Sequence, residues 1–298
     1  MRVNMDTQFK KGKGLTLIEL LIALAISAIL IAAIYRTFIG QQKTYTVQEQ
    51  VVDMQQNVRV AINRMMREIR MAGFGGKNEN TGGDNDIIKI FGNVNGFVNI
   101  INPANDVTVD GINHDQIVVV AAYDQIATLE EDAAAKSGSF RVNFTGSTRF
   151  DKTWRKYVCI DGRNNYAIMP TDGDVLTLEG GATLKENHSA GEPVFLVRAI
   201  RYGLRKDDRK IPVLFRDLYP NTVSSQRDTV AENIENVQFE YFDADGKPTA
   251  IPANIRMVKV TVIARTSMAD PEFKGGAGGF RRRTITSNIH VRNMGVNP

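Results

Sequence analysis

The chain has 298 residues, 43% of them hydrophobic and 23% charged, and these proportions exclude a disordered protein. The formal net charge is +4, of which +3 comes from the first 14 residues, where four basic residues face only Asp6. The remainder is close to neutral, so overall charge gives no support for a nucleic-acid-binding protein. The single cysteine, Cys159, excludes an intrachain disulfide, and we expect it to be a small buried residue in a strand.

The first predicted element is a membrane-spanning helix. The basic leader MRVNMDTQFKKGKG precedes an apolar run at residues 15–34, in which Glu19 is the only charged residue. Twenty residues at ~1.5 Å each are enough to cross a hydrocarbon core of ~30 Å. No cleavage site of the A-x-A type follows this run at the expected place, so a secretory signal peptide is disfavoured. The basic leader predicts a cytoplasmic N-terminus and a periplasmic head at the inner membrane.

The helix is predicted to continue through residues 35–72, with one apolar stripe that needs a partner surface. The stripe recurs at helical spacing and consists of Val51, Met54, Val58, Ala61, Met65, Ile69 and Ala72. Arg59, Arg64, Arg67 and Arg70 lie mostly off the stripe and predict a solvated face, with contact to an acidic partner as the alternative. Gly73 in MAGFGG is the expected C-cap.

Beyond the helix, the sequence predicts a flexible polar linker at 73–86 and a β-rich globular head at 87–298. The expected strands lie at 117–123, 140–144, 156–160, 175–178, 194–204, 237–242, 255–266 and 287–292. The predicted fold class is therefore α+β, a lollipop in which a long N-terminal helix packs on a mostly antiparallel sheet.

The start of the helix resembles the class III signal of type IV pilins and pseudopilins. The residues that carry the resemblance are Gly14, then LTLIE at 15–19, then the apolar helix. The resemblance implies that prepilin peptidase removes residues 1–14 after Gly14 and methylates the new α-amine of Leu15, where the family more often has Phe. Glu19 would then pair with the α-amine of a neighbouring subunit and check its register, because an unpaired carboxylate in an apolar core is costly.

Two later stretches resemble the PilW family of minor pilins and, more distantly, the pseudopilin GspJ of type II secretion. They are QNVRVAINRMMREIRMAGF in the helix, and AENIENVQFEYFDADGKP followed by NIRMVKVTVIART. The resemblance implies a non-enzymatic subunit that helps to prime type IV pilus assembly and sits at the pilus tip. The implied partners are other minor pilins, the major pilin, prepilin peptidase, the inner-membrane assembly machinery and the membrane.

Residues that could carry other chemistry form no recognisable motif. His114, His188 and His290 are widely separated, and neither a zinc-protease nor a nucleophile-elbow pattern occurs. In FDADGKP, residues 242–248, the downstream glutamate of a calcium loop is missing, which favours a hairpin turn. We therefore predict no cofactor, metal site or small-molecule substrate.

The run Arg281, Arg282 and Arg283 could contact DNA phosphates, but a charged edge strand is the preferred interpretation. Two alternatives to a minor pilin stay open at this point. One is a pseudopilin of a type II secretion system. The other, of a different class, is a membrane-anchored periplasmic ligand-binding or DNA-uptake protein.

Overall fold

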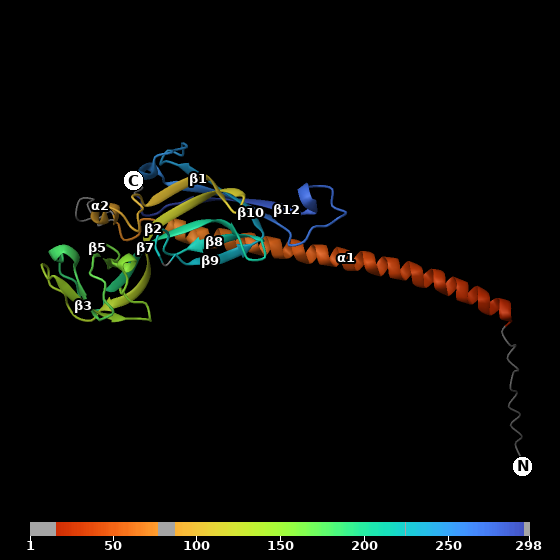
Figure 1. The fold of residues 1–298 in the computed structure, drawn as a ribbon, viewed down its shortest axis with the longest axis horizontal. Coiled ribbons are helices and arrows are strands. Elements are labelled where there is room, and N and C mark those ends of the chain that lie inside the picture. Colours follow the sequence, from red (N-terminus) through yellow and green to blue (C-terminus); the bar gives the residue numbers. More distant parts are fainter. Residues whose placement is uncertain (1–15, 77–86, 224, 295–298) are drawn as a thin grey trace, which may run out of the picture. The chain divides into compact units, whose positions relative to one another are not determined.

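The computed structural model of the chain describes residues 16–76, 87–223 and 225–294. The chain divides into two compact units, residues 1–50 and 51–298. One long helix, α1 (Leu17–Arg70), is followed by antiparallel β-sheets, so the predicted α+β class is confirmed (Figure 1). Gly14 and Leu15 lie outside the described residues.

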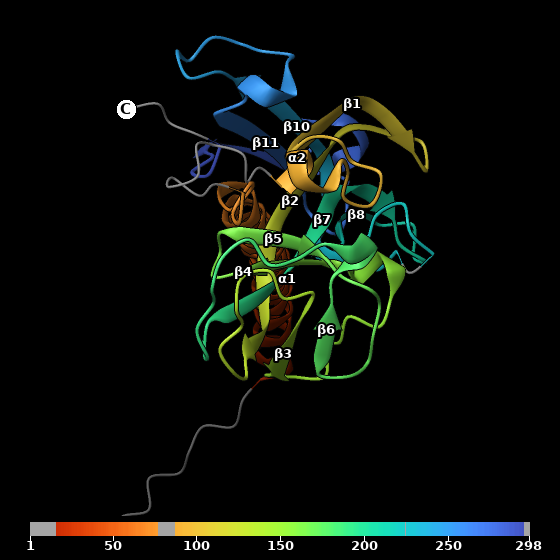
Figure 2. The same ribbon diagram turned by 90° about the vertical axis from the view of Figure 1, so that its left-hand side faces the viewer.

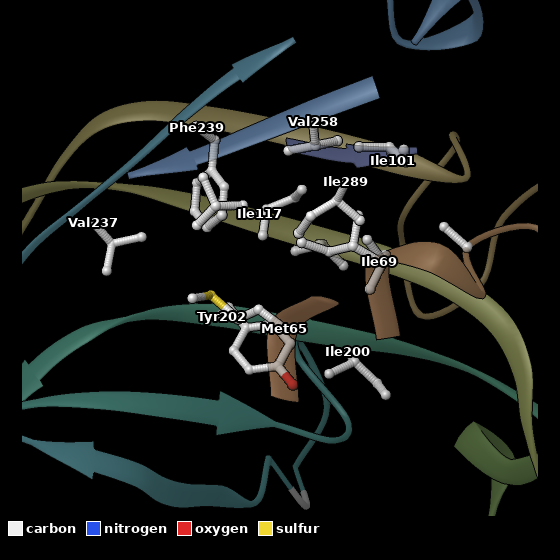
Figure 3. Packing of buried hydrophobic residues seen from close by; sticks show 14 of the residues in the cluster. Met65, Ile69, Ile101, Ile117, Ile200, Tyr202, Val237, Phe239, Val258 and Ile289 are labelled. Atoms are coloured by element: carbon white, nitrogen blue, oxygen red, sulfur yellow. The ribbon is translucent and has the colours of Figure 1, made fainter. Parts of the chain in front are cut away.

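In the head, residues 51–70 of α1 bury the predicted stripe. Met54, Val58, Ala61, Met65 and Ile69 are all buried, whereas Val51 is half-buried. Figure 3 shows Met65 and Ile69 between residues of two sheets, with Val258 and Ile289 on one side and Ile200 and Tyr202 on the other. The helix is therefore a central layer of the main hydrophobic core.

The helix ends at Arg70 in a tight turn, and the beginning of the predicted linker is packed rather than solvated. Gly73 and Gly75 have φ values of +78° and +92°. A Cβ on Gly75 would lie 3.0 Å from both Ala122 Cβ and Cys159 Sγ, so only glycine fits there. Phe74 stacks edge-on against Phe195 with 5.5 Å between ring centroids. Residues 73–76 are thus packed in the head, and the flexible linker stays a prediction for residues 77–86, which lie outside the described part.

The larger sheet has the order β5-β4-β7-β2-β3-β6, with β1 added on β2, and β8 and then β9 added beyond β7. All of its pairs are antiparallel. Its strands are β1 (Ile101–Val109), β2 (Ile112–Leu129), β3 (Ser139–Phe144), β4 (Tyr157–Ile160), β5 (Asn164–Ala167), β6 (Val175–Thr177), β7 (Pro193–Lys206), β8 (Pro212–Asp217) and β9 (Arg227–Glu232). A short helix, α2 (Ile87–Phe91), precedes it, and 3₁₀ helices lie at Thr153–Arg155, Glu179–Gly181, Pro252–Asn254 and Ala277–Gly279.

The smaller sheet is β10-β11-β12, built from β10 (Ile234–Phe242), β11 (Met257–Arg265) and β12 (Arg282–His290). Buried and half-buried residues alternate along β11, as expected for a sheet with one face on the core. The predicted turn between β10 and β11 is confirmed. Asp243 Oδ1 accepts the backbone N–H groups of Asp245 (3.0 Å) and Lys247 (2.8 Å), and Gly246 has a φ of +74°.

The middle of the chain, which lies between the two stretches that resemble PilW, builds a second hydrophobic core. Its largest fully buried side chains include Phe150, Ile168 and Leu176. Figure 2 shows β3, β4, β5 and β6, which carry much of this core, grouped below the smaller sheet. Every expected strand is present with shifted ends, whereas β1, β5, β8, β9 and α2 were not predicted.

Candidate functional site: the start of the long helix

A capping box closes the first turn of α1. The Glu19 backbone N–H donates to Thr16 Oγ1 (3.3 Å), and Glu19 Oε2 in turn accepts the Thr16 N–H (3.3 Å) and hydroxyl (3.2 Å). The first N–H groups of a helix lack partners inside the helix, and a Thr-x-x-Glu pair satisfies two of them reciprocally. Glu19 is therefore held at the helix start by local geometry alone.

This arrangement leaves Glu19 able to accept a further donor. Both hydrogen bonds of its side chain use Oε2, and a carboxylate offers about four lone-pair sites. Oε1 makes no hydrogen bond to the described residues. The pairing of Glu19 with a neighbouring α-amine stays a prediction, because Leu15 is outside the described part and the structure holds one chain.

The helix beyond the capping box exposes an apolar surface. Every residue from Thr16 to Thr46 is exposed, including Leu24, Ile29 and Phe38. By length and composition, the helix is long and apolar enough to cross a membrane. A continuous apolar surface of this kind marks a site of membrane or protein contact.

A buried ion pair that the sequence analysis did not identify fixes the other end of the helix in the head. Arg216 binds Glu68 through both carboxylate oxygens, with Nη2–Oε1 at 2.7 Å and Nε–Oε2 at 3.1 Å. The Tyr202 hydroxyl donates to Oε2 (2.6 Å), and Arg64 Nε lies 3.2 Å from Oε1. The Tyr123 hydroxyl donates to the Glu68 carbonyl (3.1 Å). The carboxylate is 7% exposed and fully surrounded by donors, which is the condition for tolerating a buried charge.

The electrostatics of this cluster are those of a stable ion pair. Burial, and then the nearby Glu68 carboxylate, raises the pKa of Tyr202 well above its ordinary value, so the phenol stays a donor. Burial, the largest single influence, would lower the pKa of Arg216, but the hydrogen bond and the charge of Glu68, together with other nearby groups, outweigh it and the pKa is raised. The cluster has the chemistry of a structural clamp between α1 and the larger sheet.

The three arginines singled out in the sequence do not act together. Arg281 pairs with Asp270 (3.1 Å), and Arg282 binds Glu235 with Nη2–Oε1 at 2.9 Å. Arg283 is exposed and forms no ion pair within the described residues. The arginines stand at the start of an edge strand, as the preferred interpretation expected. The DNA contact stays a prediction.

The other reactive side chains are separated and have structural partners. Cys159 is fully buried in β4, and burial strongly raises the pKa of its thiol, which makes it a poor nucleophile. His188 bonds Glu192 Oε2 (2.8 Å) and Tyr166 Oη (3.4 Å) under a loop of the second core. His114 is buried in β2, and burial lowers its pKa, whereas His290 ends β12.

Comparison with known families adds one match. The family described as the prokaryotic N-terminal methylation motif matches residues 9–35, which include Gly14, Leu15 and Glu19. Searches of curated proteins and of solved structures gave no significant match. The matched motif, together with the long exposed apolar helix, supports a membrane-anchored type IV pilin or pseudopilin that is processed by prepilin peptidase.

Proposed function

We propose that the protein is a PilW-like minor pilin that helps to prime type IV pilus assembly and sits at the pilus tip with other minor pilins. The observation that carries this proposal is the methylation motif at the start of a helix whose apolar half is exposed from Thr16 to Thr46 within the described residues. Prepilin peptidase removes residues 1–14 and methylates Leu15. The mature helix then passes from the inner membrane into the filament, and the head lies in the periplasm before export.

Two features favour a minor subunit over the repeating shaft subunit. The head has two hydrophobic cores, and its middle region builds the second one. A bulky head is easier to accommodate at a filament end, where no further subunit packs beyond it. The chain also has a single cysteine, so it lacks the disulfide-closed C-terminal loop that many major pilins have.

In this proposal Glu19 has two tasks. It caps its own helix through Oε2, and its Oε1 accepts the α-amine of a neighbouring Leu15 when helices pack without water. An axially displaced subunit would leave the carboxylate unpaired, and breaking a buried pair costs about 3–5 kcal/mol. The pair thereby selects the correct register.

The first experiment is the intact mass and N-terminal sequence of the protein isolated from membranes with and without prepilin peptidase. We expect a chain that starts at methylated Leu15 only when the peptidase is present. A chain that keeps residues 1–14 in both strains would exclude a pilin or pseudopilin, and would leave an anchored periplasmic binding protein.

A second experiment separates a pilus subunit from a secretion pseudopilin, which shares the same processing. Deletion of the gene should abolish or strongly reduce surface pili and leave the secreted protein profile unchanged. Loss of secretion with normal piliation would instead assign the chain to a type II secretion system.

A further inference from the structure

The last strand leaves one edge of the smaller sheet open. β12 pairs only with β11, and their register runs from Arg265↔Arg282 to Met257↔His290 without a bulge. A backbone hydrogen bond lies at each end of this strand pair. The Thr266 N–H donates to the Arg281 carbonyl, and the Val291 N–H donates to the Arg256 carbonyl, both at 2.9 Å. Because backbone groups alternate in direction along a strand, the odd-numbered residues of β12 bond to β11. The even-numbered residues Thr284, Thr286, Asn288 and His290 therefore direct their N–H and C=O groups away from the sheet.

Among the described residues, the outward-directed backbone groups of the even-numbered residues make one hydrogen bond. The next even-numbered residue, Arg292, donates its N–H to the Arg70 carbonyl at the end of α1 (3.3 Å). The backbone groups of Thr284, Thr286, Asn288 and His290 have no partner among the described residues, and all four residues are exposed. The open edge, defined as residues 284–290, is thus a ready template for another strand.

The other sheet edges within the described residues are protected. β1 has Pro103 and a register shift between Ala104 and Val107, and β9 is rich in charged residues. β5 and β6 have four and three residues. The outer edge of β10 is bonded, since the Phe239 N–H donates to Asp115 (2.9 Å) and the Tyr241 carbonyl accepts from Thr249 (2.9 Å). Residues 284–290 contain no proline, bulge, Asp, Glu, Lys or Arg, so the usual protection is missing there.

Positive charge flanks the open edge at both ends. Arg283 stands at its start, and Arg292 stands at its end beside Arg70, whose carbonyl accepts the Arg292 N–H; all three are exposed and form no ion pair within the described part of the chain. Neighbouring Arg281 and Arg282, in contrast, are neutralised by Asp270 and Glu235. The unneutralised charge is therefore concentrated where an added strand would begin and end.

This charge pattern selects the occupant. If a second copy of β12 paired antiparallel about Thr286, Arg283 of each copy would lie beside the His290–Arg292 end of the other. Parallel pairing in register would set Arg283 against Arg283. Both arrangements bring like charges together, which is unfavourable across a strand pair. A different chain with acidic residues at both ends of its strand is complementary in either direction.

We propose that the open edge of β12 is a strand-addition site for an extended segment of a different protein chain, with an uncharged β-prone centre and acidic residues at both ends. Main-chain hydrogen bonds supply the affinity, and the flanking arginines supply the specificity. The site does not depend on processing at Leu15, so it goes beyond the proposed function and is tested separately from it.

The test uses the full-length protein in nonionic detergent and a synthetic probe, acetyl-Glu-Asp-Val-Thr-Val-Thr-Val-Asp-Glu-amide. We expect saturating peptide to slow hydrogen exchange at the amides of Thr284, Thr286, Asn288 and His290 by about tenfold or more, because open-edge amides become hydrogen-bonded. The same peptide with proline at its centre, and a version with lysine at both ends, should give little protection. Unchanged exchange with the acidic peptide, or equal protection by the lysine version, would overturn the proposal.

The matched variants are Thr286→Pro and Thr286→Val. Proline removes one outward N–H and no backbone hydrogen bond to β11, so the fold tolerates it at an edge, whereas valine keeps the N–H. Both variants lose the exposed hydroxyl contact with Thr261 on β11 (3.2 Å), so valine is the matched control for that loss. Binding should weaken about tenfold or more in the proline variant only. If that variant does not fold, Arg283→Glu with Arg292→Glu decides instead, because it should reverse the preference to the lysine-flanked peptide. The assignment would be contradicted if the folded Thr286→Pro variant, or the folded Arg283→Glu and Arg292→Glu double variant, bound the acidic peptide as tightly as the wild type does. Formation of dimers linked through β12 would contradict it as well.

Discussion

The two halves of α1 obey the same helical rules in opposite surroundings. Residues 17–46 expose all their apolar side chains, whereas residues 51–70 bury a stripe against two sheets of the same chain. The first half has the exposed Thr16–Glu19 capping box at its start, and the second has the buried Glu68–Arg216 pair near its end. One half is thus complete as folded, and the other still requires a membrane or neighbouring helices.

The largest effect should come from breaking the clamp in the completed half. Glu68→Ala leaves Arg216 buried without its carboxylate, and we expect the head to lose about 3–5 kcal/mol of unfolding free energy. Urea unfolding of the full chain in detergent measures this loss. The double variant Glu68→Leu with Arg216→Met should recover most of it, since an apolar pair of similar size removes both charges. A stability loss in Glu68→Ala below about 1 kcal/mol would contradict a buried clamp.

A matched pair of truncations tests the contrast between the halves directly. Met65→Ala opens a cavity in the main core and should cost about 2–4 kcal/mol of head stability. Leu24→Ala removes a side chain that is 64% exposed and should change head stability by less than about 0.5 kcal/mol. The same urea titration serves both. Equal losses would mean that the halves share one core after all.

The capping box and the charge of Glu19 can be separated by two substitutions. Thr16→Ala should fray the first turn by about 1 kcal/mol, measured by amide exchange in micelles. Glu19→Gln keeps an oxygen for the cap but loses the charge, so the first turn should stay protected while the subunit enters filaments poorly. Normal incorporation of Glu19→Ala into pili would remove the case for the register pair.

The smallest effect should appear as a pH dependence at the base of β12. The hydrogen bond from Arg282 lowers the pKa of Glu235, with other nearby charge adding to it. A depressed carboxyl pKa adds stability that is present above the unfolded value of about 4.3 and is lost as pH falls through the folded value. Arg282→Gln should reduce the acid-dependent loss by less than about 1 kcal/mol in unfolding measured between pH 5 and pH 3. An unchanged slope would show that the pair contributes nothing.

The sequence predicted the parts of the fold that periodicity determines. The α1 stripe and the alternation of β10 and β11 follow from side-chain spacing, which a single chain displays. β5, with sequence NNYA, was missed because Asn164 and Asn165 are polar yet buried, with their amides bonded to Glu186 and to the Gly75 carbonyl. β1 was missed because Pro103 and its bulge disguise a strand.

In the candidate site, too, only the features that depend on local sequence were predictable. The Thr16-x-x-Glu19 spacing is a capping signature in the local sequence, so the capping box was predictable from it. The sequence analysis predicted a role only for the charge of Glu19. The Glu68–Arg216 pair joins residues 148 positions apart, and no local sequence pattern predicts it. The open edge of β12 depends on which strand lies outermost, and strand order is a property of the folded chain.

The long strands β2 and β7 have a consequence for how the head unfolds. Ile117 and Tyr202 belong to the main core, whereas Leu129 and Val194, on the same two strands, belong to the second core. Unfolding of the second core would expose parts of β2 and β7 to water, and the same two strands form part of the main core. The head should therefore lose structure in one cooperative transition, with no stable half-folded form for proteases to attack.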